Sequence, residues 1–400
     1  MFPRRYLLPA TYSYNSDNLP LSVERDMTCR AGDIIALIEE LAPPHLAEDW
    51  DNVGLQVGSA RVEVEAALIS LEADPEVMVE ARGRGAGLLV CHHPPIFRPL
   101  RRLVTDEPTG ALLRDALASG VAIYAAHTNL DASPHGVNAA LAGLFALQDQ
   151  RPLLGTAAEE GYKLVTFLPP GHVAEVSAAL FQAGAGVIGD YTGCSFRVEG
   201  MGTFTPGPGS HPAYGEATGA NEVSEVRLEL VVARGRIGEA VEALLQAHPY
   251  EEPAYDVYRL HVPSGAGLGR VGDLPAPVSL GEFARRCRVE LGNPAARLAG
   301  DPAIAVHRVA VCGGSGGKLW MRALEAGAQV LLTGDVSHHE AREAVAAGLA
   351  VIDAGHYHTE RPVVPHLASV LSEKTEEKGL KVEILVSDVH TYPWIDGGAE

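Results

Sequence analysis

Short apolar runs alternate with segments of helical periodicity in the N-terminal third of the chain. Residues 66–71 and 87–91 have the length and composition of buried strands, and residues 75–84 between them carry apolar positions at helical spacing. A further helix is expected over residues 109–119 and a further strand over residues 121–126. This order predicts a βαβ unit extended by one helix and one strand, with parallel strands and right-handed crossovers.

The same layout returns near the C-terminal end of the chain. A strand over residues 309–312, a helix over 318–326 and a strand over 327–332 repeat the first unit at a constant offset. The strand that follows, residues 349–356, resembles residues 121–127 with one inserted residue, and both end beside a histidine. The sequence therefore predicts two similar βαβ-type modules; the alternative is that any two α/β units share this layout.

The composition changes between the two modules. Residues 221–232 alternate apolar and polar positions, as expected of a half-buried strand, and a loop rich in Gly, Pro and Ser is expected over residues 200–219. The other predicted elements are strands over 162–167 and 254–260, helices over 172–183 and 237–247, and one more strand before Gly200. The order strand, helix, strand, strand, helix, strand is that of a ferredoxin-like α+β domain.

These elements predict an α/β protein whose core is discontinuous in sequence. The first half of the core is expected over residues 28–155 and the second half over residues 263–400. The inserted domain is expected between them, over residues 156–262, which is an ordinary domain size. A Gly- and Ser-rich hinge over residues 263–269 is expected to lead back to the core.

The N-terminal segment, residues 1–27, is expected to be a disordered tail. It carries Arg4 and Arg5 but lacks the continuous apolar segment and the cleavage site of a signal peptide. Met27 directly precedes the first amphipathic segment, so both Met1 and Met27 are candidates for the start of the protein.

Acidic residues outnumber basic ones. The chain carries 51 Asp and Glu against 31 Lys and Arg, a formal net charge of -20, which makes nucleic acid and anionic membranes unlikely partners. The five cysteines are scattered and form no C-x-x-C pair, which argues against a disulfide framework and a zinc knuckle. Every apolar run is shorter than the roughly 20 residues that a membrane-spanning helix needs. A cytoplasmic protein is therefore expected.

Side chains that bind metals gather at the ends of the predicted strands. His92 and His93 directly follow the strand over residues 87–91, and the prolines after them cannot continue a ladder. The further candidates are His127 and Asp131 after the next strand, and Asp335, His338, His339, His356 and Glu360 in the second module. Ligands bind at this carboxyl edge in open α/β sheets. We therefore expect a common site, although two adjacent histidines alone would also suit a solvated loop.

The residue types indicate which cations such a site would hold. Imidazole and carboxylate ligands favour Zn, Mn, Fe, Co or Ni over Ca or Mg, and a shared carboxylate can bridge two cations. His356 and Glu360 have the spacing at which one helical turn directs both side chains to one point. The donors are few for two complete coordination shells, so water or substrate must fill the rest. Open positions of that kind are typical of catalysis or binding.

Three further motifs each allow two interpretations. The Gly-rich segment 313–318 suits either a phosphate cradle or a tight turn that needs small residues, and Leu319 stands where a P-loop has Ser or Thr. Asp51 and Asn52 either face a polar site or belong to an ordinary loop. The segment 248–253 is either a binding segment or a turn bounded by prolines.

Five motifs follow one another along the chain: WDNVGL from Trp50, the His92-His93 pair, HTNLD from His127, TGD from Thr333 with His338-His339, and GHYHTE from Gly355. Together they resemble the GTP cyclohydrolase I type 2 family, also called the NIF-three-like proteins. The resemblance covers about residues 28–395, and the insert is similar to the PII/CutA-like domain of the longer bacterial members. It implies two divalent metal ions per subunit and a toroidal homohexamer whose metal sites face an internal cavity. The implied metal ligands are His92, His93, Asp131, His356 and Glu360.

The resulting hypothesis is a metal-dependent hydrolase that acts on a nucleotide-like or heterocyclic small molecule. Ring opening or hydrolysis needs a metal-activated water and proton transfer, for which His127 and His338 are candidates. Alternatively, these histidines act with Asp335 and His339 as residues that orient the metal ligands. Cys91 is either an assisting thiol or a small buried hydrophobe. A competing hypothesis is a non-catalytic regulator that binds a metal or a metabolite and senses it through the insert.

Overall fold

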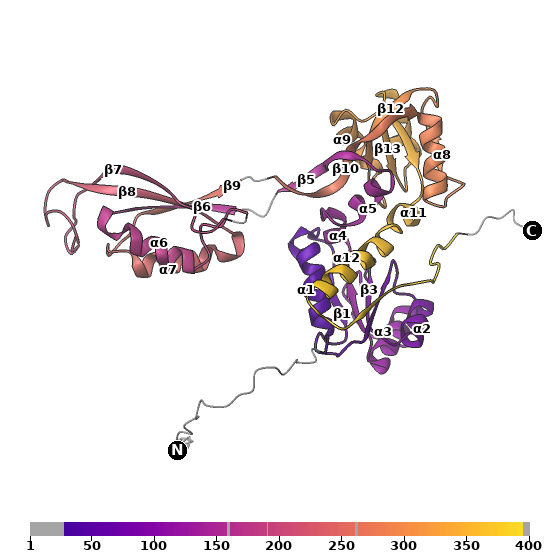
Figure 1. Ribbon diagram of the computed structural model, residues 1–400, viewed down its shortest axis with the longest axis horizontal. Helices are drawn as coiled ribbons and strands as arrows, with labels where there is room; N and C mark the ends of the chain where they lie inside the picture. The colour runs from indigo at the N-terminus through magenta and orange to yellow at the C-terminus, as the bar shows by residue number, and fades with distance from the viewer. Residues whose placement is uncertain (1–27, 158–160, 190, 261–262, 395–400) are drawn as a thin grey trace, which may run out of the picture.

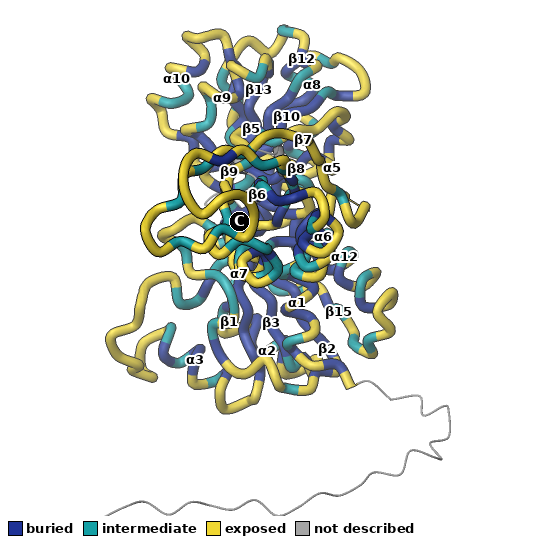
Figure 2. Tube along the Cα trace, turned by 90° about the vertical axis from the view of Figure 1, so that its left-hand side faces the viewer, coloured by how far each residue is buried: buried dark blue, intermediate teal, exposed yellow. Residues whose placement is uncertain are grey.

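The computed structural model describes residues 28–157, 161–189, 191–260 and 263–394 (Figure 1). In these residues the strands form a five-stranded, a six-stranded and a four-stranded sheet, and the predicted α/β character is confirmed. Buried residues run along the central strands of the two core sheets (Figure 2). None of the helices in the described ranges has the length and apolar character needed to cross a bilayer. The predicted N-terminal tail, residues 1–27, lies outside the described residues.

The five-stranded sheet contains the first predicted module. Its order is β1-β4-β3-β2-β15, in which β1 is antiparallel to β4 and the other neighbours are parallel. The strands are β1 (Gly54–Val57), β2 (Ala66–Ser70), β3 (Ala86–Cys91), β4 (Ala122–Ala125) and β15 (Glu383–Val386). One face packs on α1 (Ala31–Leu41) and α12 (Val363–Glu377), the other on α2 (Pro75–Gly83) and α3 (Pro108–Ser119). Burial on both faces explains the continuous apolar runs.

The six-stranded sheet contains the second module. Its order is β11-β14-β13-β12-β10-β5, with parallel pairing only among β12, β13 and β14. The strands are β5 (Gln148–Ala157), β10 (Pro263–Ser279), β11 (Arg297–Ala299), β12 (Ala305–Val311), β13 (Val330–Thr333) and β14 (Ala350–Asp353). One face packs on α5 (Val137–Leu144) and α8 (Leu280–Glu290), the other on α9 (Trp320–Glu325) and α10 (His338–Ala346). Short 3-10 helices occur at Pro44–Leu46, Pro170–His172, Arg234–Arg236 and Gly317–Leu319.

The two modules share one arrangement of strands. In each, three neighbouring parallel strands have an antiparallel edge strand beside the third. The spatial orders are β2-β3-β4-β1 and β12-β13-β14-β11. In each, the third parallel strand leads directly into a one-turn helix, α4 (Thr128–Ala132) or α11 (His356–Glu360). Figure 1 shows α4, α11 and α12 between the two core sheets. The predicted repeat therefore corresponds to a repeated topology.

The two halves of the core also exchange strands. Strand β5 belongs to the first half of the sequence but pairs with β10 in the second sheet. Strand β15 follows the second module but pairs with β2 in the first sheet. A division of the core at residue 155 therefore does not coincide with a division between the sheets. Hydrophobic periodicity marks a strand without indicating which sheet it joins.

The insert forms a separate sheet with helices on one face. Its elements are β6 (Gly161–Leu168), α6 (Val173–Gln182), β7 (Phe196–Phe204), β8 (Asn221–Val232), α7 (Ile237–Ala247) and β9 (Tyr255–Leu260). All neighbours in the order β7-β8-β6-β9 are antiparallel. Apolar residues of β6 and β8 pack against α6 and α7, which leaves the opposite face of the sheet open. In Figure 1 this domain lies to one side of the two core sheets.

The predicted hinge over residues 263–269 is wrong, because these residues begin β10. They pair with β5, and Gly267 lies opposite Gly155. A Cβ atom on Gly267 would lie 2.2 Å from the carbonyl oxygen of Leu154, so the glycines reflect close packing of strands rather than flexibility. The predicted loop over residues 200–219 is also too long, since β7 extends to Phe204.

Candidate metal centre

Three strand ends deliver the candidate ligands to one place. His92 and His93 directly follow β3, and Asp131 lies on α4 after β4. His356 and Glu360 lie on α11 after β14, where Gly355 adopts a φ of 82° at the turn into the helix. Because these are carboxyl ends of parallel strands, the side chains meet at the edge where α/β sheets bind ligands.

The donor atoms form three overlapping clusters, each spanning no more than 4.8 Å. The clusters are His92, Asp131 and Glu360; His93, His356 and Glu360; and His92, His93 and His127. All five predicted ligands belong to at least one cluster, and His127 joins them. Glu360 is common to two clusters: its Oε1 lies 3.1 Å from Nε2 of His356, and its Oε2 lies 3.2 Å from Nε2 of His93. This carboxylate is therefore placed to bridge.

Each of the four imidazoles has its Nδ1 atom held by an acceptor. The acceptors are the Ala126 carbonyl for His92 at 2.8 Å, Glu72 for His93 at 2.7 Å, Asp51 for His127 at 2.9 Å and Asp335 for His356 at 2.7 Å. An Nδ1–H that donates to such an acceptor fixes the ring and leaves the Nε2 lone pair free. All four Nε2 atoms are therefore available to bind a cation.

Three buried atoms at the centre lack a hydrogen-bond partner among the described residues. They are His92 Nε2, Asp131 Oδ1 and Glu360 Oε2, the last of which lies 3.2 Å from Nε2 of His93 without forming a hydrogen bond to it. A buried polar atom without a partner costs about 1–3 kcal/mol, so three of them in one place require an explanation. Divalent transition-metal ions with nitrogen and oxygen ligands would satisfy all three atoms. The residues present thus fit a metal centre.

The ionisation of the centre reflects its burial and its mixture of charges. Burial raises the pKa of Glu360, but the imidazoles of His356, His92 and His93 outweigh it and hold this pKa well below its ordinary value. Burial raises the pKa of Asp131 to about 6. In the absence of a cation, protons on the imidazoles neutralise Glu360. Cations would replace these protons.

His127 differs from the other imidazoles in its ionisation. Burial and the neighbouring His92 lower its pKa, and they outweigh the opposite effect of Asp51. His127 is therefore neutral at neutral pH, the form in which an imidazole binds a metal. This environment suits a further metal ligand, and the role of His127 in proton transfer stays a prediction.

Two exposed aromatic rings lie beside His127. Trp50 is 60% exposed and Phe97 is 44% exposed, and their ring centroids are 5.9 Å apart. The centroid of the His127 ring lies 6.3 Å from that of Trp50 and 6.2 Å from that of Phe97. An apolar surface therefore adjoins the donor clusters.

The remaining candidate site residues have different positions and contacts in the structure. Asp335 holds His356 through Nδ1, whereas His338 and His339 are exposed at the start of α10 and belong to none of the donor clusters found in the described residues. Cys91 is buried, its thiol faces the Tyr124 carbonyl oxygen, and burial raises its pKa. Cys91 is therefore a small core residue rather than a reactive thiol.

Sequence reasoning missed Glu72 and left Asp51 undecided. Glu72 lies two residues beyond the end of β2, and its acidic side chain at the carboxyl edge of the sheet was the available signal. Asp51 lies on the loop before β1, and no local pattern connects it to His127. Both residues act through contacts across the fold.

The Gly-rich segment is explained by close packing. A Cβ atom on Gly314 would lie 2.2 Å from Oε1 of Glu360. The backbone N–H groups of Gly313, Gly314 and Gly316 donate to the side chains of Asn138, Thr359 and Thr333 at 2.9, 3.0 and 2.9 Å. Donors already used in this way do not form a phosphate cradle, and the absence of a side chain at Gly314 admits Glu360.

Comparisons with known proteins give matches over most of the chain. A family model described as Duf34/NIF3 (NGG1p interacting factor 3) matches residues 29–393. Proteins of Halalkalibacterium halodurans and Mycobacterium leprae, both named GTP cyclohydrolase 1 type 2 homolog, are 38% and 39% identical to this chain. The alignments cover 90% and 92% of this chain and 97% and 96% of those proteins.

Solved structures give the same result. A Bacillus cereus protein described as related to NIF3 is 39% identical and superposes with a TM-score of 0.75, covering 92% of this chain and 100% of that one. A Staphylococcus aureus protein is 29% identical with a TM-score of 0.81, covering 92% of this chain and 99% of that one. The similarity therefore includes both the core modules and the insert.

Proposed function

The chain belongs to the Duf34/NIF3 family, and from this membership and the donor geometry we propose that it holds two divalent transition-metal ions and hydrolyses a nucleotide-like or heterocyclic small molecule. One observation carries the proposal. His92 Nε2, Asp131 Oδ1 and Glu360 Oε2 are buried without partners at the point where the donor clusters overlap. Such atoms are tolerated where a ligand satisfies them.

The clusters suggest how the residues divide between two ions. His92 and Asp131 would hold one ion, His93 and His356 the other, and Glu360 would be shared. His127 would complete the shell beside His92. This set fits Zn, Mn, Fe, Co or Ni.

The chain's own residues would prepare the site for hydrolysis. Two divalent cations supply Lewis acidity and lower the pKa of bound water. Asp51, Glu72 and Asp335 hold the Nδ1 protons of three imidazoles and thereby fix their orientation. The exposed rings of Trp50 and Phe97 offer a surface on which the planar ring of a substrate can stack. A role of His338 in proton transfer remains a prediction from the sequence.

Metal analysis tests the base of the proposal. Purified chain reconstituted with Zn, Mn, Fe, Co or Ni should bind about two ions, because the donors serve two positions. Fewer than about one ion per chain after reconstitution with excess ion at neutral pH, where the cation has to displace the imidazole protons, would contradict the proposal. Glu376, on the exposed surface of α12, is the control position for substitutions of Glu360.

Turnover is tested with a pooled metabolite extract. Metal-loaded protein should remove specific masses from the pool, and Glu360→Ala should not, while Glu376→Ala behaves as the unsubstituted protein. Circular dichroism checks that both variants are folded. Loss of the same masses with Glu360→Ala would assign the activity to another site or to a contaminant.

A second candidate function is a non-catalytic regulator that binds a metal or a metabolite. It is favoured by a cavity in the insert that is lined entirely by residues of that domain. In this function the metal-loaded protein leaves the metabolite pool unchanged. Steady turnover that is lost in His92→Ala with the fold intact would exclude it.

We further propose that the insert is a ferredoxin-like domain of the PII/CutA-like kind, which its strand order β7-β8-β6-β9 supports.

A toroidal homohexamer in the cytoplasm is proposed from the family resemblance. Light scattering tests the assembly, since a hexamer has six times the chain mass of 42.2 kDa. A monomeric or dimeric mass would contradict it.

A further inference from the structure

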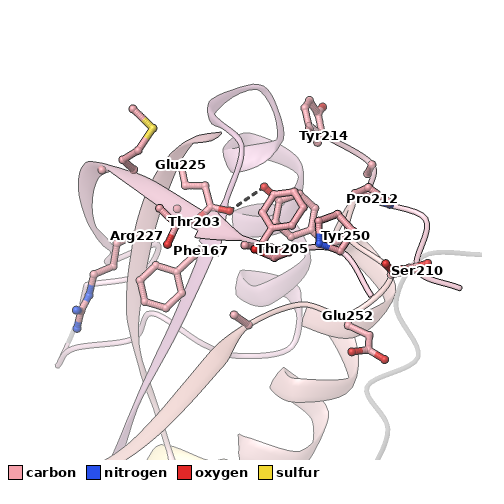
Figure 3. Close-up of a pocket in the computed structure, with 18 of the residues that line it drawn as sticks. Phe167, Thr203, Thr205, Ser210, Pro212, Tyr214, Glu225, Arg227, Tyr250 and Glu252 are labelled. Atoms are coloured by element: carbon pink, nitrogen blue, oxygen red, sulfur yellow. Dashed lines mark hydrogen bonds between the residues drawn. The ribbon is translucent and has the colours of Figure 1, made fainter. Parts of the chain in front are cut away.

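The insert contains a cavity of about 730 Å³ on the face of its sheet opposite the helices. Strands β7 and β8 form its floor, and the loop around residues 205–214 and the turn at residues 250–252 form its walls. Figure 3 shows Tyr250 between Glu225 on one side and Glu252 on the other. This volume is within the range of small-molecule sites.

The cavity is hollow because β7 carries glycine where a side chain would fill the space. Gly200 pairs with Glu225 across β7 and β8 and lies on the same face of the sheet. A Cβ atom on Gly200 would meet no atom within 4 Å. A Cβ atom on Gly202 would lie 2.2 Å from the carboxylate of Glu225. The backbone of β7 thus leaves room in front of a carboxylate.

The walls combine aromatic rings with carboxylates. Phe167, Tyr214 and Tyr250 line the cavity together with Glu225 and Glu252. The hydroxyl of Tyr250 donates to Oε1 of Glu225 at 2.8 Å. Burial and this carboxylate raise the pKa of Tyr250, so the phenol stays protonated and fixes the position of Glu225.

The arginine in the cavity does not offset these carboxylates. Nε of Arg227 donates to Oε1 of Glu229 at 2.8 Å, and its guanidinium lies 5.8 Å from the centroid of the Phe167 ring. Arg227 is therefore paired with a carboxylate of its own strand. The cavity retains an excess of negative charge beside aromatic faces.

We propose that this cavity binds an organic cation, a ligand with an ammonium group on an aromatic or alkyl body. The ammonium group would pair with Glu225, and the body would lie against Phe167 and Tyr250. Carboxylates and aromatic faces both attract ammonium groups, whereas they repel the carboxylate or phosphate of an anionic ligand. The site is independent of the proposed metal centre, since no metal-cluster residue lines it.

Calorimetric titration of the full-length, metal-loaded protein with tryptamine tests the proposal. Indole-3-propionate is the matched probe, because it carries a carboxylate in place of the ammonium group on the same ring and linker. Saturable binding of tryptamine at one site per chain is expected, with indole-3-propionate at least about tenfold weaker, the equivalent of one charge-assisted hydrogen bond. Equal binding of the two probes overturns the proposal. Absence of tryptamine binding also overturns it, and this is the result expected if a second copy of the chain covers this face.

Two substitutions assign the binding to this cavity. Glu225→Gln should weaken tryptamine binding at least about tenfold, whereas Glu222→Gln, on the same strand but outside the cavity, should leave it unchanged. Gly200→Leu should abolish binding by filling the space, without backbone strain, since Gly200 is not in the left-handed region. Metal content and unfolding temperature should stay unchanged in all three variants. Tryptamine binding that survives both Glu225→Gln and Gly200→Leu overturns the assignment.

Discussion

Asp51 and His127 are 76 residues apart in the chain, yet Oδ1 of Asp51 lies 2.9 Å from Nδ1 of His127. The second carboxylate oxygen accepts from the backbone N–H of Thr128 at 3.0 Å. Burial raises the pKa of Asp51, but these hydrogen bonds outweigh it and hold the pKa below its ordinary value. An ionised Asp51 therefore fixes both the orientation of His127 and the start of α4.

Substitution Asp51→Asn should weaken metal binding by about 10–100-fold, the usual effect of losing an acceptor behind a metal-binding imidazole. The amide can present its NH2 group to Nδ1 and thereby favour the wrong tautomer. Competition with a chromophoric chelator measures the change. Asp49→Asn, on the exposed part of the same loop, is the control. Equal affinity of the two variants would show that Asp51 does not orient His127.

Substitution Gly314→Ala should remove at least one metal ion, because the new methyl group would displace Glu360. Gly314 has a φ of 64°, and its Cβ atom would lie 2.2 Å from the carboxylate. Gly348→Ala is the matched control, with a φ of 93° and no atom within 4 Å. Both variants should lose about 1–2 kcal/mol of stability from the left-handed backbone, but only Gly314→Ala should lose metal by elemental analysis. Full metal content in Gly314→Ala would contradict the proposed role of Glu360.

The metal-free and metal-loaded proteins should respond to pH in opposite directions. Glu360 and Glu72 outweigh burial and raise the pKa of His93 from 6.5 to about 10. Glu360 also outweighs burial at His356, whose pKa rises from 6.5 to about 9. Because of these raised pKa values, the two protonated imidazoles stabilise the metal-free protein. This stabilisation is complete below pH 6.5 and is lost as the pH rises through the folded-state pKa values. Metal binding needs neutral imidazoles, so it strengthens over the same range.

Thermal unfolding of chelator-treated and zinc-loaded protein, followed between about pH 6 and pH 9, checks this prediction. The difference in unfolding temperature between the two forms should grow with pH. A difference that is constant or shrinks would show that protons and cations do not compete for these imidazoles.

Arg270 should contribute to stability and to the position of α4. Arg270 is 3% exposed, and its guanidinium donates to the carbonyl oxygens of Gly267, Gly269 and Ser133 at 2.7, 2.8 and 2.7 Å. Substitution Arg270→Met leaves these acceptors without donors and should lower the free energy of unfolding by about 2 kcal/mol. Urea unfolding measures it, with the exposed ion-paired Arg285→Met, expected to change by less than about 1 kcal/mol, as control. Equal effects would show that the buried contacts contribute nothing.

The strands and the histidines at their ends were predictable because both depend on local sequence. Apolar runs buried on both faces mark β2, β3 and β4, and polar residues must follow where each strand ends. The exchange of β5 and β15 was not predictable, because strand partners are chosen by the whole fold. The start of β10 was mistaken for a hinge, since glycines that permit close packing have the composition of a linker. Glu72 and Asp51 likewise acquire their roles only through tertiary contacts.

The repeated topology has a consequence for the symmetry of the proposed metal centre. His127 and Asp131 stand after the third parallel strand of one module as His356 and Glu360 stand after that of the other. Two copies of an ancestral unit, facing each other, would build such a centre with one donor pair from each side. In separate identical chains every substitution would appear in both copies. Within one chain the two strand ends can differ, and one carries two imidazoles where its counterpart carries a glycine and Asp335.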